Sequence, residues 1–363
     1  MKGIYILVLA FAITLFACGN KNGPQPSGST GKYDFSSVDR FIDQNQGVYN
    51  NRVAVLITQN NEVIYQREIN MTVNTTFGIA SASKWLSAGV IMALVDDKKL
   101  SLDDKIGKYL PIFNNYHKGD ITIRQLFSHT AGFAGDGDTD RAQLRKKFEY
   151  RSDMTLARAV DSIAVYTPLL NAPGTTFNYG STSMQIAGRI AEVVSGKSWQ
   201  DLFNEKIARP CSMSALYLQM STPNPLVAGG ARTSAANYIN FLKMITNRGT
   251  YNGVRVLSEN SVIQMTTDQT RNAVIQGTPY AANPYTTPSL NAVRYGIGNW
   301  LDVTDAAGNV IESSSPGLFG THPWQSHKQQ IAGIIFTQTT GKKSNAVSLQ
   351  IRQMVREIIA KQN

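Results

Sequence analysis

Two residues three positions apart, Ser81 and Lys84, have side chains that could perform nucleophilic chemistry together. They stand at the start of an apolar segment that runs to Leu100 and repeats its large side chains at helical spacing. Residues three apart on a helix share a face, so a buried, deprotonated Lys84 could accept the proton of the Ser81 hydroxyl. The alternative is a helix-capping serine followed by a surface lysine. The spacing alone does not decide, because Ser29 and Lys32 repeat it in a Gly/Ser/Pro-rich segment.

A Ser–Lys pair needs a third group that passes a proton to the leaving group, and a tyrosine phenol held near cations can do this. Four Tyr-x-Ser or Tyr-x-Asn sequences occur, at Tyr49, Tyr150, Tyr179 and Tyr238. Tyr179 follows a turn in residues 172–177 and precedes a segment with helical periodicity, so we expect its phenol at a loop–helix junction. The others lie before the first strand, in a charged stretch and inside a helical run. A purely structural Tyr179 stays the alternative.

The first residues of the chain have the pattern of an export signal. Lys2 supplies a positive charge, residues 4–16 are apolar but too short to span a membrane as a permanent helix, and the run ends Leu-Phe-Ala-Cys at Cys18. This ending resembles a bacterial lipobox, so we expect a lipoprotein signal peptide over residues 1–17 and a lipid on Cys18. A flexible tether over 18–32 would then link an exported lipoprotein to an envelope membrane. An ordinary signal peptide or a membrane anchor is the alternative.

Composition restricts the remaining chain, residues 33–363, to a globular domain with its own core. Cys211 is the only cysteine besides Cys18, so lipidation of Cys18 leaves no intramolecular disulfide. The net charge is +10, but the basic residues are scattered without a Lys/Arg run. We therefore expect a solvated basic surface and no nucleic-acid partner. No segment after residue 17 is apolar over a length that would cross a bilayer.

Strand-like runs occur near both ends of the chain, and helical periodicity dominates between them. The predicted strands cover residues 53–58, 63–66, 295–303, 317–322 and 331–338. The predicted helices cover residues 37–46, 83–97, 122–128, 155–165, 181–195, 199–207, 234–247 and 258–267, and an amphipathic helix closes the chain. We therefore predict an α+β fold with a sheet lobe (33–80 and 225–363), an inserted helical lobe (81–224) and a ligand cleft between them.

Five segments resemble, in order, the motifs of the β-lactamase-related serine hydrolases, which include class C β-lactamases, D,D-peptidases and class C-like esterases. The resemblance covers roughly residues 35–360 and implies a β-lactamase/transpeptidase-like fold, with an antiparallel sheet flanked by helices. The matching segments are FGIASASK (77–84), LSLDDK with KYLP (100–105 and 108–111), ITIRQLFSHTAG (121–132), PGTTFNYGS (173–181) and GGARTSA (229–235).

The resemblance also implies roles for individual residues. Ser81 would attack a carbonyl carbon and form an acyl-enzyme, with Lys84 as general base. Tyr179 would assist Lys84 and later deliver a proton to the leaving group, and Ser181 would hydrogen-bond within this network. The backbone N–H of Ser81, at a helix start, would be one oxyanion-hole donor, and the second would come from residues 317–319.

The third motif of the family, Lys-Thr-Gly or His-x-Gly, is not found where it is expected. The corresponding region reads ESSSPGLFGTH (312–322), and Ser315, Gly317, Leu318 and Phe319 are our candidates for the third-motif and oxyanion region. The cation of this motif helps to bind substrate carboxylates. Its replacement by a Ser-Pro-Gly edge favours an esterase or amidase acting on an uncharged acyl group, unless Arg232 or His322 supplies a cation. We expect His322 to contact the substrate.

The remaining histidines give no metal site. His129 could be a general base for a serine, but its His-Thr-Ala-Gly setting favours a structural turn. His322 and His327 are five residues apart around a proline, and no third ligand is evident, so we expect no metal and no cofactor.

We therefore predict a metal-independent serine hydrolase that cleaves an ester or amide through an acyl-enzyme at Ser81. The first alternative is a D,D-carboxypeptidase or β-lactamase that acts on cell-wall peptides or β-lactams. A second alternative, from another class, is a non-catalytic penicillin-binding-like sensor, which the missing third-motif cation would favour.

Overall fold

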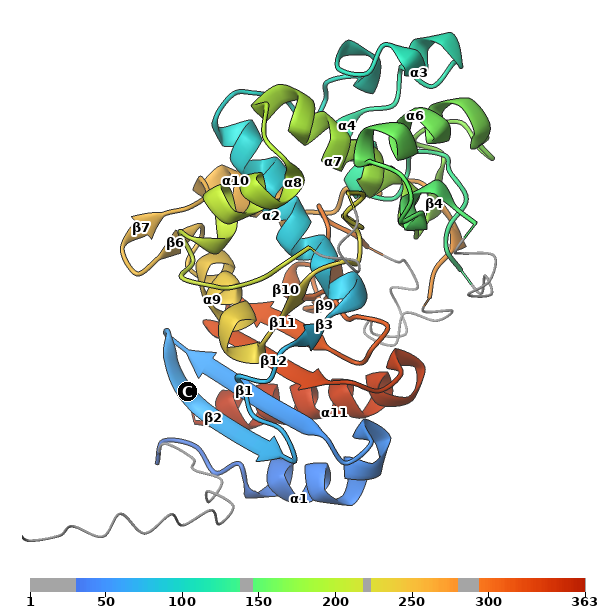
Figure 1. The fold of residues 1–363 in the computed structure, drawn as a ribbon. Helices are drawn as coiled ribbons and strands as arrows, with labels where there is room; N and C mark the ends of the chain where they lie inside the picture. The colour runs from blue at the N-terminus through green and yellow to red at the C-terminus, as the bar shows by residue number, and fades with distance from the viewer. Residues whose placement is uncertain (1–30, 138–145, 218–222, 280–293, 363) are drawn as a thin grey trace, which may run out of the picture.

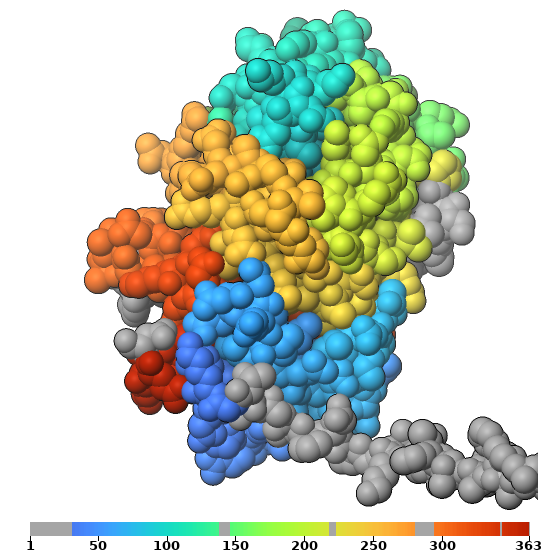
Figure 2. Space-filling model, turned by 90° about the vertical axis from the view of Figure 1, so that its left-hand side faces the viewer, coloured from blue at the N-terminus to red at the C-terminus, as the bar shows by residue number. Residues whose placement is uncertain are grey.

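The computed structural model describes residues 31–137, 146–217, 223–279 and 294–362. Cys18, the predicted signal peptide and nearly all of the predicted tether lie outside these ranges. Figure 1 shows a sheet with two helices against its outer face and a helical part above its inner face. Figure 2, from the side, shows the helical part stacked directly on the part that contains β1 and β2.

The main sheet is built from both ends of the chain, as the sequence predicts. Its strand order is β2-β1-β12-β11-β10-β9, and all neighbouring strands are antiparallel. The N-terminal β1–β2 hairpin therefore pairs directly with the C-terminal strand β12. The strands are β1 (Val53–Gln59), β2 (Glu62–Ile69), β9 (Trp300–Thr304), β10 (Val310–Ser314), β11 (His322–Ser326) and β12 (Ile331–Thr337).

Both faces of the central strands are buried, because alternate residues of β1 enter different cores. Val53, Val55 and Ile57 pack in a core with α1 (Ser36–Asn45) and α11 (Gly341–Ala360). Ala54 and Leu56 pack in the larger core that continues into the helical part. A period of two in the side chains produces this division, and the apolar run of β1 is typical of a strand covered on both faces.

Helix α2 (Ser83–Asp96) runs from the sheet through the middle of the helical part (Figure 1). It is buried on every side from Ser83 to Leu94, which explains why apolar residues surround it instead of forming one stripe. The helices around and beside it are α3 (Ile112–Asn115), α4 (Ile123–Phe127), α6 (Leu156–Tyr166), α7 (Thr182–Ser195), α8 (Trp199–Phe203), α9 (Ala235–Thr246) and α10 (Glu259–Met265).

Three two-stranded sheets connect the loops of the helical part. The strands β3 (Phe77–Gly78) and β5 (Arg232–Thr233) form an antiparallel pair, and β3 precedes the Ser81 turn and α2 in the chain. The strands β4 (Thr176–Asn178) and β8 (Val274–Gly277) form a parallel pair, and β4 precedes α7 in the chain. The strand β6 (Thr250–Tyr251) pairs with β7 (Val254–Arg255). The first two pairs fix the segments that carry Ser81 and Tyr179.

Three sequence predictions of local structure were wrong. Residues 317–321 of the predicted strand 317–322 form a turn between β10 and β11, closed by a hydrogen bond of 2.8 Å from the Gly317 N–H to the Thr321 carbonyl, and β11 begins at His322. Pro316 and the positive φ of Gly320 (91°) favour this turn over a strand. The strand predicted from residue 295 begins at Trp300, and the helix predicted over 199–207 changes to a π-helical turn after Phe203.

Candidate active site

Ser81 lies in a 3₁₀ turn (Ala80–Ala82) between β3 and α2. Ala80, directly before it, has φ 47°, a left-handed conformation that is strained for a residue with a Cβ atom. Two groups hold this turn from the side: the Ser83 hydroxyl donates to the Ala80 carbonyl at 2.6 Å, and the Ile79 N–H donates to the Ala231 carbonyl at 3.0 Å. Ser81 therefore sits at the end of a rigid strand–turn–helix connection.

Lys84 is a buried lysine, with 1% of its surface exposed, which excludes the alternative of a surface lysine. Its Nζ atom lies 3.1 Å from the Ser81 Oγ atom and donates to the Ala228 carbonyl oxygen at 3.1 Å. Burial lowers the pKa of Lys84 from 10.5 to about 8, and the negative charge of Asp136 opposes this shift. A substantial fraction of Lys84 is therefore neutral near physiological pH and able to accept a proton.

Tyr179 completes a three-residue contact with Ser81 and Lys84. The Lys84 Nζ atom lies 4.6 Å from the centre of the Tyr179 ring, and the phenol is hydrogen-bonded to the Ser81 side chain. The ring stacks on Trp300 with a centroid distance of 5.1 Å and leaves only 8% of the residue exposed. Burial raises the pKa of the phenol, and the hydrogen bond from Ser81 opposes this shift. Tyr179 lies at the junction between β4 and α7, the loop–helix position that its flanking sequence predicts.

Ser181 lies beside this group of residues but its side chain points to other partners. Its hydroxyl donates to the Asp136 Oδ2 atom at 2.6 Å and lies 2.9 Å from the Tyr150 hydroxyl. Within the described residues, Ser181 has no hydrogen bond to Lys84 or Tyr179. The link to the proton-transfer pair therefore runs through Asp136, whose charge acts on Lys84 and Tyr179.

The predicted third-motif region lies directly against the turn that carries Ser81. The Ser315 hydroxyl donates to the Ser81 carbonyl oxygen at 3.3 Å. Gly317 is packed so closely that an added Cβ atom would lie 2.2 Å from the Ile79 carbonyl oxygen. Leu318 follows, with an exposed side chain, and its N–H has no hydrogen-bond partner within the described residues. The Phe319 ring lies next to Gly78 in β3, where an added Cβ atom would be 3.9 Å from the ring.

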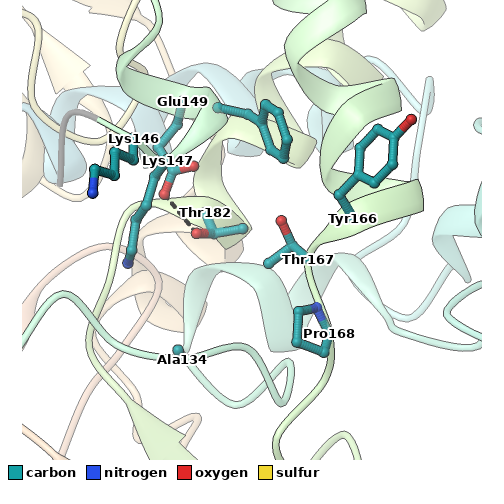
Figure 3. Close-up of a pocket in the computed structure, with 9 residues that line it drawn as sticks. Ala134, Lys146, Lys147, Glu149, Tyr166, Thr167, Pro168 and Thr182 are labelled. Carbon is teal, nitrogen blue, oxygen red and sulfur yellow. Dashed lines mark hydrogen bonds between the residues drawn. The ribbon is translucent and has the colours of Figure 1, made fainter. Parts of the chain in front are cut away.

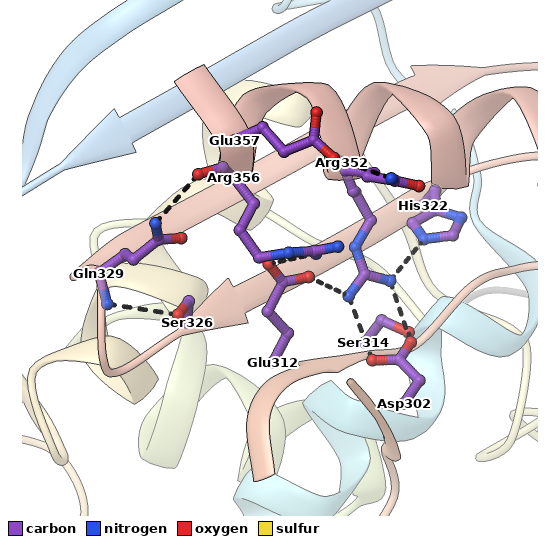
Figure 4. Close-up of polar contacts among 10 residues, drawn as sticks. Asp302, Glu312, Ser314, His322, Ser326, Gln329, Arg352, Arg356 and Glu357 are labelled. Carbon is purple, nitrogen blue, oxygen red and sulfur yellow. Dashed lines mark hydrogen bonds and ion pairs between the residues drawn. The ribbon is translucent and has the colours of Figure 1, made fainter. Parts of the chain in front are cut away.

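His322 belongs to a buried polar cluster between the sheet and α11 (Figure 4). It is 1% exposed, and its Nε2 atom lies 3.1 Å from Arg352 Nη1. Burial and the Arg352 charge hold the pKa of His322 well below 6.5, so the ring is neutral. This position gives no support to the prediction that His322 contacts the substrate.

The other two candidates for a cation or a base also have structural positions. His129 is buried beneath Tyr179 with a centroid distance of 4.5 Å, and its Nδ1 atom accepts a hydrogen bond from the Gly180 N–H at 3.4 Å. Burial and the Lys84 charge hold the pKa of His129 well below 6.5. Arg232 donates to the Thr76 carbonyl at 3.3 Å on the exposed side of β5.

Three residues near the centre were not found from the sequence. Asp136 stands in a loop without a motif, and Tyr150 was set aside because it lies in a charged stretch. Trp300 carries no sequence pattern that connects it with Tyr179. Their proximity depends on loops that meet in space, and the only sequence signal was the Tyr-x-Ser pattern at Tyr150.

The profile of the Beta-lactamase family matches residues 38–354, almost the whole described part of the chain. The chain belongs to the Beta-lactamase family. A putative β-lactamase from Bacteroides dorei has a similar structure, with a TM-score of 0.77 and 30% sequence identity over 90% of this chain and 99% of that one.

Two further proteins are similar to this chain. Penicillin-binding protein 4 of Amycolatopsis lactamdurans is 34% identical over 148 residues, which are 40% of this chain and 36% of that protein. A family VIII carboxylesterase has a TM-score of 0.66 at 17% identity, covering 87% of this chain and 97% of that one, and it shares the fold. The predicted family and the predicted α+β fold are therefore confirmed, and the neighbours of this chain are hydrolases of the esterase, amidase and penicillin-binding types.

Proposed function

We propose that the protein is a serine hydrolase that forms an acyl-enzyme at Ser81 and cleaves an ester or amide. The observation that carries this proposal is the contact of three groups in one place: the Ser81 hydroxyl, the Lys84 amine 3.1 Å away and the Tyr179 phenol bonded to Ser81. A nucleophile with a base and a second proton carrier in contact is the arrangement that acyl transfer requires.

In the first step, neutral Lys84 accepts the Ser81 proton while the Ser81 oxygen attacks the substrate carbonyl carbon. Tyr179 then passes a proton to the departing alcohol or amine, and the positive Lys84 restores the phenol. Water enters for the second step, the same pair removes its proton, and attack on the acyl-enzyme releases the acid and regenerates Ser81. Burial of both groups supports this role, because it keeps the Tyr179 phenol protonated and increases the fraction of Lys84 that is neutral before substrate binds.

The developing negative charge on the carbonyl oxygen needs two N–H donors. We assign them to Ser81 and Leu318. Supporting this choice, the Gly317 N–H is already bonded to Thr321, whereas the Leu318 N–H has no partner within the described residues. Gly317 packs against Ile79 and so brings Leu318 close to the turn that carries Ser81. A missing donor of this kind lowers kcat by roughly 10²–10³-fold.

The third-motif region beside Ser81 lacks the cation that binds a substrate carboxylate in the family. It therefore favours substrates that have no carboxylate at this position. Ser315 offers a hydroxyl there, while His322 is buried and Arg232 is bonded to Thr76. We therefore propose an esterase or amidase. The D,D-carboxypeptidase or β-lactamase alternative is supported by the relative named penicillin-binding protein 4. A penicillin-binding sensor that acylates without turnover remains the alternative from another class.

The nucleophile is tested by intact-mass spectrometry of the whole protein after treatment with a fluorophosphonate or a penicillin. We expect one covalent adduct on the wild-type protein and none on Ser81→Ala. The proposal is wrong if neither reagent reacts, or if the adduct persists in Ser81→Ala.

The substrate class is tested by comparing kcat/KM for short-chain p-nitrophenyl esters, nitrocefin and a D-Ala-D-Ala peptide. We expect the esters to be preferred, with turnover abolished in Ser81→Ala. A preference for either carboxylate-bearing substrate would favour the peptidase or β-lactamase alternative. A stable penicillin adduct without turnover of any substrate would favour the sensor.

We also propose that the mature protein is attached to an envelope membrane by a lipid on Cys18, which rests on the sequence of residues 1–18. No helix within the described residues is long and apolar enough to span a membrane. Mass spectrometry of the N-terminal peptide from the native host would reveal the lipid, and Cys18→Ser should release the protein from the membrane fraction.

A further inference from the structure

A second polar cluster lies directly beside the proposed acid–base pair, and nothing in the proposed reaction uses it. Its centre is the Asp136 carboxylate. The Ser181 hydroxyl donates to Asp136 Oδ2 at 2.6 Å, and the Lys147 amine donates to Asp136 Oδ1 at 2.8 Å. Tyr150 donates to the same carboxylate at 3.4 Å and lies 2.9 Å from the Ser181 hydroxyl. The cluster thus joins the loop before α7 to the segment around Lys147.

The backbone of the same loop is bound to the catalytic segment. The Asp136 N–H donates to the Tyr179 carbonyl oxygen at 2.8 Å. Gly180 is packed against residues 134–136, where an added Cβ atom would lie 3.2 Å from three backbone atoms. A movement of Asp136 therefore displaces Tyr179 and Ser181 together, so the carboxylate is mechanically linked to the phenol.

Asp136 and Lys147 are largely buried, and only 18% and 24% of their side chains are exposed to solvent. Lys84 and Tyr179 are both buried and within the electrostatic reach of Asp136, which raises the pKa of each. A charge that acts across a buried region is screened less than one on the surface. A change in the charge of Asp136, or in its neutralisation by Lys147, should therefore change the pKa values of Lys84 and Tyr179.

We propose that Asp136 is a positioning residue for the acid–base pair, and that its ion pair with Lys147 sets the pH range in which Lys84 is an active base. This inference rests on the proposed hydrolase function and deepens it. Asp136 holds Ser181 and the Tyr179 backbone in place, while Lys147 balances its charge. The two partners of one ion pair then act on Lys84 in opposite directions, which a purely structural contact would not do.

The other ionisable groups around these residues do not replace Asp136. Lys84 faces Tyr179 and the neutral, buried His129, and neither carries a negative charge near neutral pH. Glu149 is buried near the cluster, where its carboxylate accepts a hydrogen bond of 2.6 Å from Thr182 and burial raises its pKa. Figure 3 shows Glu149 and Thr182 on the wall of a neighbouring cavity of about 240 Å³, with Lys147 beside them.

The experiment compares pH profiles of Asp136→Asn and Lys147→Met. Two readouts are recorded: kcat/KM on an ester and the rate at which a fluorophosphonate labels Ser81. Asp136→Asn keeps a hydrogen-bond acceptor for Ser181 but removes the negative charge, so the acidic limb should move to lower pH by about 0.5 unit or more. Lys147→Met leaves the Asp136 charge unbalanced, so the limb should move to higher pH by a similar amount.

The kcat at the plateau of the pH profile distinguishes the loss of positioning from the loss of charge. Asp136→Ala removes both the charge and the acceptor for Ser181, and we expect its plateau kcat to fall about 10-fold below that of Asp136→Asn. Matched controls come from the exposed pair Arg151 and Asp153, whose variants Arg151→Gln and Asp153→Asn make the same charge changes a few residues after Lys147. These controls should leave the pH profile unchanged.

Opposite shifts for Asp136→Asn and Lys147→Met support the inference, and equal, like-signed or absent shifts overturn it. If Asp136→Asn fails to fold by circular dichroism, Lys147→Met alone decides by the presence or absence of the upward shift. If fluorophosphonate labels wild-type Ser81 but neither variant shifts the limb, only this inference fails. If wild-type Ser81 is not labelled at all, the proposed function fails with it.

Discussion

At the residue scale, the same burial that makes Lys84 a base also makes it a destabilising residue. The Lys84 pKa falls from 10.5 to about 8 on folding, so the unfolded chain binds more protons than the folded protein between these pH values. Stability contributed by this group therefore rises as the pH rises from about 8 to 10.5 and is at its lowest below pH 8. The site is assembled at the expense of stability, as is common for active sites.

Lys84→Met should consequently stabilise the protein at pH 7 while it abolishes turnover. The unfavourable ionisation corresponds to about 3 kcal/mol, and the loss of the hydrogen bonds to Ala228 and Ser81 reduces the gain to roughly 1–2 kcal/mol. Urea unfolding at pH 7 and pH 9.5 measures the gain, which should shrink at the higher pH. The exposed Lys99→Met serves as control and should change little at either pH. A variant less stable than wild type at pH 7 would contradict the argument.

At the element scale, strand β10 and the turn after it are held by a buried charge cluster. Arg352 of α11 donates to both Asp302 oxygens at 3.0 and 3.1 Å and to Glu312 at 2.8 Å (Figure 4). The Ser314 hydroxyl, one residue before Ser315, donates to the same Asp302. The closing helix therefore anchors the strand end that contacts Ser81. The sequence predicted this helix but not the cluster, because its members come from three separate strands and a helix.

Arg352→Met should destabilise the protein by about 3–5 kcal/mol, because it removes the cation paired with buried Asp302 and leaves Glu312 with Arg356 alone. Urea unfolding monitored by circular dichroism gives the free energy of unfolding. Arg356→Met is the matched control, because its side chain is 27% exposed and forms one ion pair within the described residues, with Glu312. A loss of about 1 kcal/mol is expected. Equal losses for the two variants would show that the buried cluster is not what holds α11 to the sheet.

At the scale of the whole molecule, the sheet meets the helical part at the contact between Gly317 and the turn that carries Ser81. The turn after β10 approaches the Ile79 carbonyl oxygen so closely that only glycine fits there. On the other side, the Ala228 carbonyl oxygen accepts a hydrogen bond from the Lys84 amine, and the Ala231 carbonyl oxygen accepts one from the Ile79 N–H. The nucleophile is thus enclosed by segments that lie far from it in the chain, 144 residues after Lys84 at Ala228 and 234 residues after Ser81 at Ser315.

Gly317→Ala should therefore separate the turn from Ser81 and lower kcat/KM by roughly 100-fold, the effect of a misplacement of about 1 Å in an active site. Steady-state ester hydrolysis measures the loss, and circular dichroism checks that the fold is kept. Gly47→Ala is the matched control, because an added Cβ atom there meets no atom within 4 Å. If Gly317→Ala kept full activity, the close contact would have no role in shaping the site.

Several features could be predicted from the sequence because they depend on local patterns. Ser81 and Lys84 share a helix turn, and the apolar periodicity of α2 predicts its burial. The Tyr179 position follows from a turn before a helix, and apolar runs at both chain ends predict the shared sheet. The ordered motifs gave the family correctly. The turn at residues 317–321 was mistaken for a strand because its apolar residues resemble one, although Pro316 and two glycines argue against it.

The sequence by itself determined the kinds of groups available for proton transfer and the helix and turn that carry them, since local spacing sets which side chains share a face. Tertiary structure alone decided the environment of those groups. In the folded protein Lys84 is buried and Trp300 stacks on Tyr179. His322 lies in the Arg352 cluster, and Asp136 accepts a hydrogen bond from Ser181. Burial and charge proximity depend on contacts between segments distant in the chain, and these set the proton affinities on which the proposed chemistry depends.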